Sequence, residues 1–289
     1  MIRFMYLFIL ILKMPGGIRK NIVFHFLKRL IGLRSTDHQT IWTSFLYFVA
    51  ESNAQITMDN GLYRVSFFDE EKRMDALIRG ADSSDIFAFF QVFIAKGYQP
   101  LRDFLSVKLI QPKVVVDAGA NVGYFSLLMA NKLTSLFVAI EPEITNYNLL
   151  KRNILLNGLQ DTCNSMHKAL WTHKQELSVQ TNSGLEWAVQ VSEGKSDQSC
   201  LAISLPEIIM ELSIANIDLL KMDIEGTEGL LFKNELFLES LGKVKVIAME
   251  IHDKLANRKL IHSSLHEAGF EFFEKGELTL AWNKKLVNA

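Results

Sequence analysis

The stretch that most constrains the fold of this 289-residue chain runs from Val114 to Phe125 and reads VVVDAGANVGYF. Three β-branched residues lead into Asp117, a turn with two glycines follows, and an apolar helical pattern comes next. This order predicts a buried strand, a tight loop and a helix, the opening unit of a nucleotide-binding type of α/β sheet. We expect Gly119 and Gly123 to let the backbone turn sharply and approach a ligand where a Cβ atom would clash. Asp117, at the carboxyl end of the strand, is placed either to bind that ligand or to hold the loop.

The spacing of the glycines discriminates between classes of ligand. A dinucleotide loop has the pattern G-x-G-x-x-G, but here its second and third glycine positions are Asn121 and Tyr124. A nicotinamide-dependent oxidoreductase is therefore disfavoured, because a diphosphate could not come close to Tyr124. The pattern present, D-x-G-x-N-x-G, resembles the S-adenosylmethionine loop of class I methyltransferases with its middle glycine replaced. That ligand carries no phosphate and needs less bare backbone.

An acidic residue ends the next predicted strand. Glu141 lies 24 residues after Asp117 and follows the apolar run 136–140. A carboxylate at this position suits hydrogen bonds to two ribose hydroxyls. The candidate cofactor-binding residues are therefore Asp117, Gly119, Asn121, Gly123 and Glu141.

The rest of the second half repeats strands and helices in the rhythm of a parallel sheet. The polar segment 180–199 predicts a hairpin and loop, and Ser204 to Glu207 form a capping box at the start of a helix. We expect further strands at 164–170, 217–223 and 244–251, and a terminal antiparallel pair at 270–273 and 278–282.

The N-terminal third has a different character. Residues 4–12 are an unbroken apolar run, too short to span a bilayer because a spanning helix takes about 20 residues. Residues 18–33 interleave basic and apolar side chains, a pattern typical of a basic amphipathic helix. This helix is expected either to lie on an anionic membrane surface or to pack on the main domain or a partner. A helix at 41–50, a hairpin at 55–67 and a helix at 85–95 follow.

Composition sets further limits. A net charge of −1 gives no reason to expect nucleic acid as a partner. Cys163 and Cys200 lie far from any C-x-x-C spacing, so neither a zinc site nor a disulfide framework is indicated. The expected location is the reducing cytoplasm, with peripheral membrane contact through residues 1–34 left open.

The candidate catalytic residues lie at or just after the carboxyl ends of the fourth and fifth predicted strands, 217–223 and 244–251. We expect these two strands to be neighbours in the sheet. Ligands in open α/β sheets bind outside the carboxyl ends of the strands, where Asp223, Glu250 and His252 stand. Methyl transfer from a sulfonium needs alignment, exclusion of water and removal of a proton. Asp223 is the candidate base or hydroxyl-orienting group, with Glu250 or His252 as an accessory. The alternative is a purely structural role, in which Lys221 forms an ion pair with Asp223 and Glu225 caps the following helix.

A carboxylate is a weak base for an alcohol. It needs burial and neighbouring acids to raise its pKa, or a metal ion to lower the pKa of the hydroxyl. The acids and the histidine are acceptable ligands for a divalent ion. A metal is therefore possible, although no metal site is predicted.

Four strings of this sequence together resemble the FkbM family of methyltransferases, over residues 112 to 282. They are VVDAGANVGYFS at 115–126, EP at 141–142 with LKRN at 150–153, DLLKMDIEGTE at 218–228, and MEIH at 249–252. The resemblance implies a Rossmann-like α/β fold, with a seven-stranded mostly parallel sheet and helices on both faces. It also implies S-adenosylmethionine as cofactor and O-methylation of a sugar or natural-product hydroxyl. By matching position, the five candidate cofactor-binding residues would line the cofactor and Asp223 would face the substrate.

We therefore predict an S-adenosylmethionine-dependent O-methyltransferase acting on a small-molecule or glycan acceptor. Its parts are an N-terminal apolar and basic segment (1–34), a preamble of helices and a hairpin (35–111) and the methyltransferase domain (112–289). Methylation of base amino groups is less favoured, because such enzymes carry D/N-P-P-Y/F where this chain has DIEG. The alternative from another class is a non-catalytic membrane-surface binding or assembly factor that keeps the cofactor fold.

Overall fold

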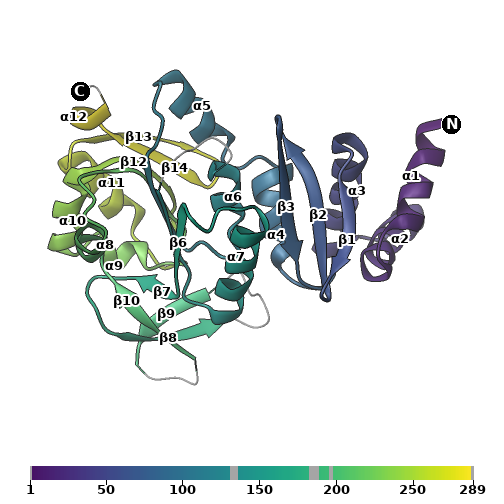
Figure 1. Ribbon diagram of the computed structural model, residues 1–289, viewed down its shortest axis with the longest axis horizontal. Helices are drawn as coiled ribbons and strands as arrows, with labels where there is room; N and C mark the ends of the chain where they lie inside the picture. Colours follow the sequence, from purple (N-terminus) through teal and green to yellow (C-terminus); the bar gives the residue numbers. More distant parts are fainter. Residues whose placement is uncertain (1, 131–135, 182–188, 195–197, 288–289) are drawn as a thin grey trace. The chain divides into compact units, whose positions relative to one another are not determined.

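The chain divides into two compact units, Met1–Lys96 and Gly97–Ala289 (Figure 1). The structure, a computed structural model, describes residues 2–130, 136–181, 189–194 and 198–287. The second unit begins before α5 (Gln99–Val107), a helix whose residues belong to the predicted preamble.

The first unit is a three-stranded antiparallel sheet with helices. Its order is α1 (Ile2–Lys13), α2 (Gly16–Leu30), α3 (Asp37–Ser52), β1 (Gln55–Asp59), β2 (Leu62–Asp69), β3 (Lys72–Ile78) and α4 (Asp85–Phe89), which continues as a π-helical turn (Phe90–Ile94). The predicted hairpin is confirmed as β1 and β2, with positive φ at Asn60 and Gly61. Strand β3 was not predicted. Large aromatic side chains fill the core of this unit: Trp42, Phe45, Phe67, Phe89 and Phe93.

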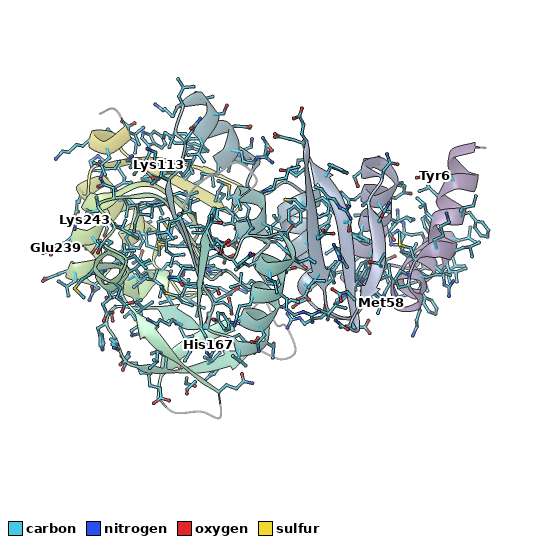
Figure 2. The ribbon with its side chains drawn as sticks, viewed as in Figure 1. Tyr6, Met58, Lys113, His167, Glu239 and Lys243 are labelled. Carbon is cyan, nitrogen blue, oxygen red and sulfur yellow. The ribbon has the colours of Figure 1, made fainter. Side chains whose placement is uncertain are left out.

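Helix α2 buries one side against the rest of the first unit and exposes the other. Ile18 and Ile22 are buried, and α2 packs against α3. Leu27 and Leu30 remain exposed on the same helix, as does Tyr6 on α1 (Figure 2). Among the described residues, α1 and the other helices fall short of the length and apolar character that membrane spanning requires.

The second unit is built on a seven-stranded sheet in the order β13-β14-β12-β11-β4-β5-β6, as the fold prediction expected. Strands β12, β11, β4, β5 and β6 run parallel, and β14 pairs antiparallel with β12 and β13. The bounds are β4 (Val114–Ala118), β5 (Leu136–Ile140), β6 (Cys163–Met166), β11 (Ile217–Met222), β12 (Val244–Glu250), β13 (Phe270–Lys275) and β14 (Leu278–Asn283). Strand β11 is buried along its whole length, as a central parallel strand should be.

Helices cover both faces of this sheet. In Figure 1, α6 (Tyr124–Ala130) and α7 (Ile144–Leu156) lie on one side, and α8 (Leu205–Glu211), α10 (Glu235–Ser240) and α11 (Arg258–Glu267) on the other. The predicted capping box starts α8: the Ser204 hydroxyl accepts from the Glu207 N–H, while the Glu207 carboxylate accepts from the Ser204 N–H. The remaining helical elements are α9 (Glu228–Leu231), a 3₁₀ turn (Leu241–Lys243) and α12 (Lys284–Val287).

The prediction of one strand over residues 164–170 is wrong. The chain forms β6 at the edge of the large sheet and then β7 (Lys168–Leu170), which belongs to a second sheet. His167, labelled in Figure 2, lies between them, and its Nε2 is 2.9 Å from the carbonyl oxygen of Pro142. His167 thus makes this contact at the point where the chain passes from the seven-stranded sheet to the second sheet.

The second sheet has four strands in the order β7-β10-β8-β9. The additional strands are β8 (Glu176–Thr181), β9 (Val189–Glu193) and β10 (Ser199–Ile203). Antiparallel pairing of β8 with β9 confirms the predicted hairpin in the polar segment. Residues 182–188 and 195–197 of that segment lie outside the described residues.

Candidate active site

The turn after β4 is held by protein contacts rather than left open. The N–H groups of Gly119 and Ala120 both donate to the carbonyl oxygen of Ile140 at the end of β5. Asp117 is fully buried, and its Oδ2 accepts a 2.7 Å hydrogen bond from the Ser126 hydroxyl. Asp117 therefore fixes the start of α6 to the end of β4. Of the two roles expected for it, binding the ligand or holding the loop, this contact corresponds to holding the loop.

The two glycines of the turn are required by close packing of the protein itself. Gly119 has φ +71°, and a Cβ there would lie 1.8 Å from the carbonyl oxygen of Asp223. Gly123 has φ +87°, and its Cβ would lie 2.4 Å from Cδ1 of Leu150 on α7. The bare backbone thus lets β11 and α7 come close, in addition to any approach that it gives a ligand.

Asn121 and Glu141 form the polar end of the site. The Asn121 N–H donates to Oε2 of Glu141 at 2.7 Å, and the Glu143 N–H donates to Oε1 at 2.9 Å. Burial raises the pKa of Glu141 to about 7, although these two backbone donors oppose the shift. A buried carboxyl with this pKa gains from further hydrogen-bond donors to its charged form.

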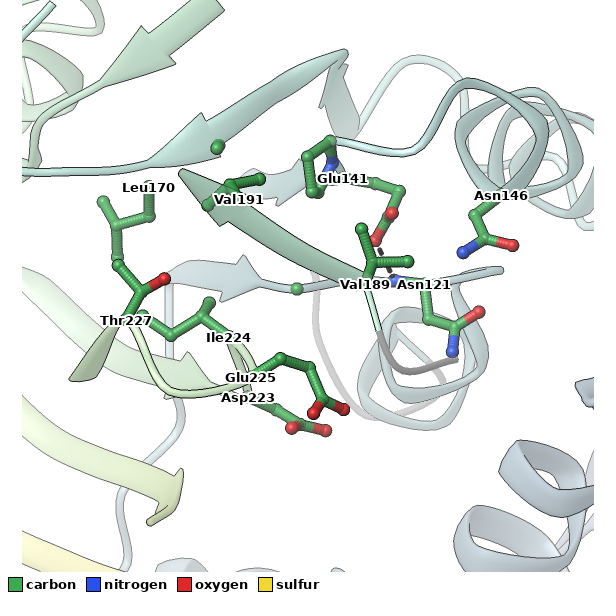
Figure 3. A pocket seen from close by; sticks show the side chains of 13 residues that line it. Asn121, Glu141, Asn146, Leu170, Val189, Val191, Asp223, Ile224, Glu225 and Thr227 are labelled. Carbon is green, nitrogen blue, oxygen red and sulfur yellow. Dashed lines mark hydrogen bonds between the residues drawn. The ribbon is translucent and has the colours of Figure 1, made fainter. Parts of the chain in front are cut away.

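A cavity opens at the carboxyl ends of β4, β5 and β11 (Figure 3). Its polar lining comes from the turn after β4, from the end of β5 and from the turn after β11. Val189 and Val191 of β9 and Leu170 of β7 add an apolar wall. The lining residues are Gly119, Asn121, Glu141, Pro142, Asn146, Ala169, Leu170, Val189, Val191, Asp223, Ile224, Glu225 and Thr227.

The structure sorts the predicted site residues into two groups. Among the candidate cofactor-binding residues, three line the cavity: Gly119, Asn121 and Glu141. Asp117 and Gly123 do not belong to its lining and support it from behind. Of the candidate catalytic residues, Asp223 lines the cavity, whereas Glu250 and His252 are not among its lining residues.

Lys221 neutralises the centre of the site. Its Nζ donates to the carbonyl oxygen of Gly119 at 2.6 Å and lies 3.3 Å from Asp117 Oδ1 and 3.8 Å from Asp223 Oδ2. Burial would lower the pKa of Lys221, but Asp117, Tyr98 and Asp223 together raise it. The predicted alternative of a Lys221–Asp223 pair therefore exists, at a distance too long for a hydrogen bond, while Asp117 is the nearer acid.

Four carboxylates surround His252. Its Nε2 lies 3.5 Å from Glu225, 3.8 Å from Glu250 and 3.9 Å from Asp223, and its Nδ1 lies 3.1 Å from Oε1 of Glu228. Burial would lower the pKa of His252, but these acids, led by Glu228, raise it to about 9. Burial and the charge of Asp223 raise the pKa of Glu225 and of Glu250 to about 7. The expected convergence of groups after β11 and β12 is confirmed.

The backbone leaves the extended conformation in the turn after β11. The alternation of side chains along a strand therefore does not explain why the acids of this turn lie together. Glu225 has a left-handed φ of +51°, and Gly226 follows with +99°. Oε1 of Glu228 accepts the Ile224 N–H at 3.2 Å, which ties the turn to the start of α9. Glu225 points to the same side as Asp223 in Figure 3. The N-cap position of α9 is Thr227, which makes no side-chain cap hydrogen bond, so the alternative in which Glu225 caps this helix is wrong.

Sequence reasoning missed Glu228 and the two valines of β9. Glu228 accepts the N–H of Ile224, four residues earlier, and an acid in the first turn of the predicted helix was its only signal. Val189 and Val191 show the alternation of a half-buried strand, inside a segment that otherwise reads as a polar loop.

A sheet of this order, with a glycine turn after its first parallel strand and acids after β5 and β11, has the Rossmann-like architecture of class I methyltransferases. Residues 117–272 match the model of the methyltransferase FkbM domain. This match spans more than half of the chain, which therefore belongs to the FkbM methyltransferase family.

Individual proteins share less with the chain. Methyltransferase sdnD of Sordaria araneosa is 26% identical over 193 residues, which cover 54% of this chain and 73% of that protein. A methyltransferase from Geobacter sulfurreducens matches with a TM-score of 0.38 and 18% identity, over 70% of this chain and 98% of that one. The METTL16 MTase domain matches with a TM-score of 0.42 and 13% identity, over 87% and 82%.

Proposed function

We propose that the protein transfers a methyl group from S-adenosylmethionine to a hydroxyl of a sugar, glycan or natural-product acceptor. The observation that carries the proposal is the cavity at the ends of β4, β5 and β11, in which Glu141 lies at one end and Asp223 at the other. Membership of the FkbM family supports the reaction class. The resemblance stated for the four sequence strings supports a hydroxyl as the acceptor.

The cavity has the chemistry to hold the donor. Each Glu141 oxygen accepts one backbone N–H and keeps acceptor capacity for a ribose hydroxyl. Hydroxyl donors would stabilise the charged form of this buried carboxyl. The apolar wall of Leu170, Val189 and Val191 suits an aromatic base and excludes water from it. S-adenosylmethionine supplies an electrophilic methyl carbon on a sulfonium when it is bound.

Asp223 is the residue that meets the acceptor. Its carboxylate lines the cavity and is about one-quarter exposed, so it can accept a hydrogen bond from an incoming hydroxyl. Lys221 on one side and His252 on the other fix its orientation through charge. An oriented hydroxyl gains reactivity because alignment converts the displacement into an effectively intramolecular step. Asp223 also accepts the proton that the hydroxyl loses as its oxygen bonds to the methyl carbon.

We also propose a location in the cytoplasm, in peripheral contact with an anionic membrane surface. Both cysteines are unpaired and buried, which supports a reducing compartment. Phe8 on α1 and Leu27 and Leu30 on α2 are exposed apolar side chains, and the last turn of α2 carries Lys28 and Arg29. Apolar and basic groups on one helix favour an anionic lipid surface. The non-catalytic alternative finds no support in the family match.

The test is a methyl-transfer screen with the full chain. S-adenosylmethionine carrying a deuterated methyl group is incubated with whole-cell glycan and metabolite extracts, and labelled products are found by mass spectrometry. We expect label on a hydroxyl oxygen of one acceptor class. Label confined to amino groups would contradict O-methylation, and the absence of labelled product from every extract would contradict the activity.

A further inference from the structure

We propose that Asp223, Glu225 and His252 bind a divalent metal ion at the edge of the cavity. One ligand atom of each side chain, two carboxylate oxygens and an imidazole nitrogen, lies within 4.8 Å of the other two. The three come from the turn after β11 and the end of β12, so two neighbouring strands of the sheet fix their positions.

The distances around His252 fit a shared ion better than direct hydrogen bonds. Nε2 lies 3.5 to 3.9 Å from oxygens of Glu225, Glu250 and Asp223, whereas a hydrogen bond from an imidazole to a carboxylate is about 2.7–2.9 Å long. One N–H can also serve only one of these acids well. Ligands of a six-coordinate ion with bonds of about 2.1 Å lie about 3 Å apart when adjacent and about 4.2 Å apart when opposite.

The other ring nitrogen is already held in the way that metal-binding histidines require. Nδ1 lies 3.1 Å from Oε1 of Glu228, which is fully buried. A carboxylate on one imidazole nitrogen fixes the ring and leaves the other nitrogen free to bind a metal. Glu228 Oε1 also accepts the Ile224 N–H, so the same side chain orients the turn that carries Asp223 and Glu225. Glu228 is thus a positioning residue for all three ligands.

The balance of charge calls for a cation at this point. Asp223, Glu225, Glu228 and Glu250 face a single imidazole, and Glu277 adds to the negative charge beside Glu250. Lys221 is the nearby ammonium, and Asp117 is its nearest acid. Oε2 of Glu228 is buried and has no hydrogen-bond partner within the described part of the chain. Glu228 is buried and the other three acids are partly buried, so their like charges repel one another, and a bound divalent ion would offset several of them at once.

The donor set selects the kind of ion. Two carboxylates suit Mg²⁺, Ca²⁺ and Mn²⁺, and an imidazole suits Zn²⁺ and other transition ions. A mixed set of two oxygens and one nitrogen therefore points to Mn²⁺ or a similar first-row ion rather than Mg²⁺. Three protein ligands leave coordination positions open toward the cavity that Asp223 and Glu225 line.

The ion also indicates the substrate class, an inference that rests on the proposed function. Open positions at the cavity edge suit an acceptor with two adjacent oxygen atoms, such as a vicinal diol or an α-hydroxy acid. The ion would lower the pKa of the bound hydroxyl, which gives its proton to solvent water. The oxygen then bonds to the methyl carbon as the carbon–sulfur bond breaks, and S-adenosylhomocysteine leaves. Asp223 would in this case orient the hydroxyl through the ion.

Ion binding can be measured without any acceptor. The full chain is freed of metal with EDTA and dialysed, and Mn²⁺ is added while the electron paramagnetic resonance signal of free Mn²⁺ is followed. We expect one Mn²⁺ per chain, and at least about tenfold weaker binding in Asp223→Asn and in His252→Gln. Glu228→Gln should weaken binding by about 10- to 100-fold although Glu228 is not a ligand. Glu239→Gln, on the exposed side of α10, is the matched control and should bind as wild type does.

The outcomes separate this proposal from the proposed function. Failure of the wild type to take up Mn²⁺, or equal uptake by wild type and both ligand variants, would overturn the metal site. Because Asp223→Asn and His252→Gln are separate variants, misfolding of one variant leaves the other as the test. Labelling of an acceptor that persists in EDTA would overturn the role of the ion in the transfer and leave the methyltransferase activity standing. Mn²⁺ uptake without labelling of any extract would support the ion site and contradict the methyltransferase.

Discussion

Nδ1 of His252 lies 3.1 Å from Oε1 of Glu228, a residue 24 positions earlier in the chain and fully buried. The same oxygen accepts the N–H of Ile224. One side chain therefore fixes both the histidine after β12 and the turn after β11, on which the cavity acids stand. The geometry of the candidate catalytic groups depends on a residue outside the cavity lining.

Gly119→Ala should be far more destabilising than Gly158→Ala. Both glycines have positive φ, +71° and +67°, but a Cβ at Gly158 meets nothing within 4 Å, whereas at Gly119 it would overlap the backbone of Asp223. We expect a loss of about 1–2 kcal/mol for Gly158→Ala, from backbone strain alone. Gly119→Ala should lose more than about 4 kcal/mol. Urea unfolding followed by circular dichroism measures both, and equal losses would contradict the close approach of β4 and β11.

Glu141→Ala should weaken stabilisation by S-adenosylhomocysteine. Ligand at 100 times its Kd stabilises a protein by about 2.7 kcal/mol, which raises the melting temperature. If Glu141 binds the ribose, the variant loses these hydrogen bonds and shows a much smaller rise at the same ligand concentration. Glu239→Gln serves as the control. A rise in Glu141→Ala as large as in the wild type would remove Glu141 from the cofactor site.

The stability of the unliganded chain should depend on the ionisation of Glu141. Burial raises the pKa of Glu141 from 4.5 to about 7. Because the pKa is higher in the folded state, the protonated group favours folding, so this contribution is complete below pH 4.5 and is lost as the pH rises through 7. The wild type should therefore lose stability relative to Glu141→Gln across this range, by about 1.4 kcal/mol per unit of pKa difference at most. Unfolding free energies measured at several pH values check this, and parallel profiles would refute it.

Asp223→Asn should keep cofactor binding and lose turnover. The amide has the same shape but accepts the acceptor's proton poorly and lacks the charge that pairs with Lys221 and His252. We expect the shift in melting temperature with S-adenosylhomocysteine to remain, and the methyl-transfer rate to fall by at least about 100-fold. Glu239→Gln should retain both. A normal rate in Asp223→Asn would exclude Asp223 from the mechanism.

Phe8→Glu and Leu30→Glu should reduce binding to anionic vesicles. Both side chains are exposed, at 61% and 83%, and a charge there opposes insertion into lipid. Substitution is a cleaner test than removal of residues 1–34, because Ile18 and Ile22 are buried and their loss would uncover α3. Flotation with phosphatidylserine-containing and neutral vesicles measures the binding. Met210→Glu, an equally exposed apolar position on α8, is the control. Equal flotation of all variants would end the membrane proposal.

The central sheet could be predicted from sequence because its signals are local. The buried runs before Asp117 and Asp223 reveal β4 and β11, and the rule that ligands gather at strand ends places Asp223, Glu250 and His252 together. The roles of Asp117 and Gly123 could not be separated in this way. Both have the residue type that a cofactor loop needs, and only the packing of α6 and α7 shows that they act from behind the cavity.

Other features depend on contacts between distant residues. At the break between β6 and β7, His167 contacts the carbonyl oxygen of Pro142, 25 residues away, and no local pattern in the sequence indicates this contact. Glu228 bridges two loops that only the parallel pairing of β11 and β12 brings together. The sequence gives the residue type at such a position, but it does not give the distant residue with which the side chain interacts.

The valines of β9 belong to the four-stranded sheet, which shares no strand with the seven-stranded one. Changes in length or side chain within that hairpin can therefore remodel one wall of the cavity while the donor-holding turns after β4 and β5 stay as they are. In the proposed enzyme this wall faces the base of the donor, so the apolar contacts of the donor and its polar contacts with Glu141 belong to separate stretches of chain, and one can diverge while the other is kept.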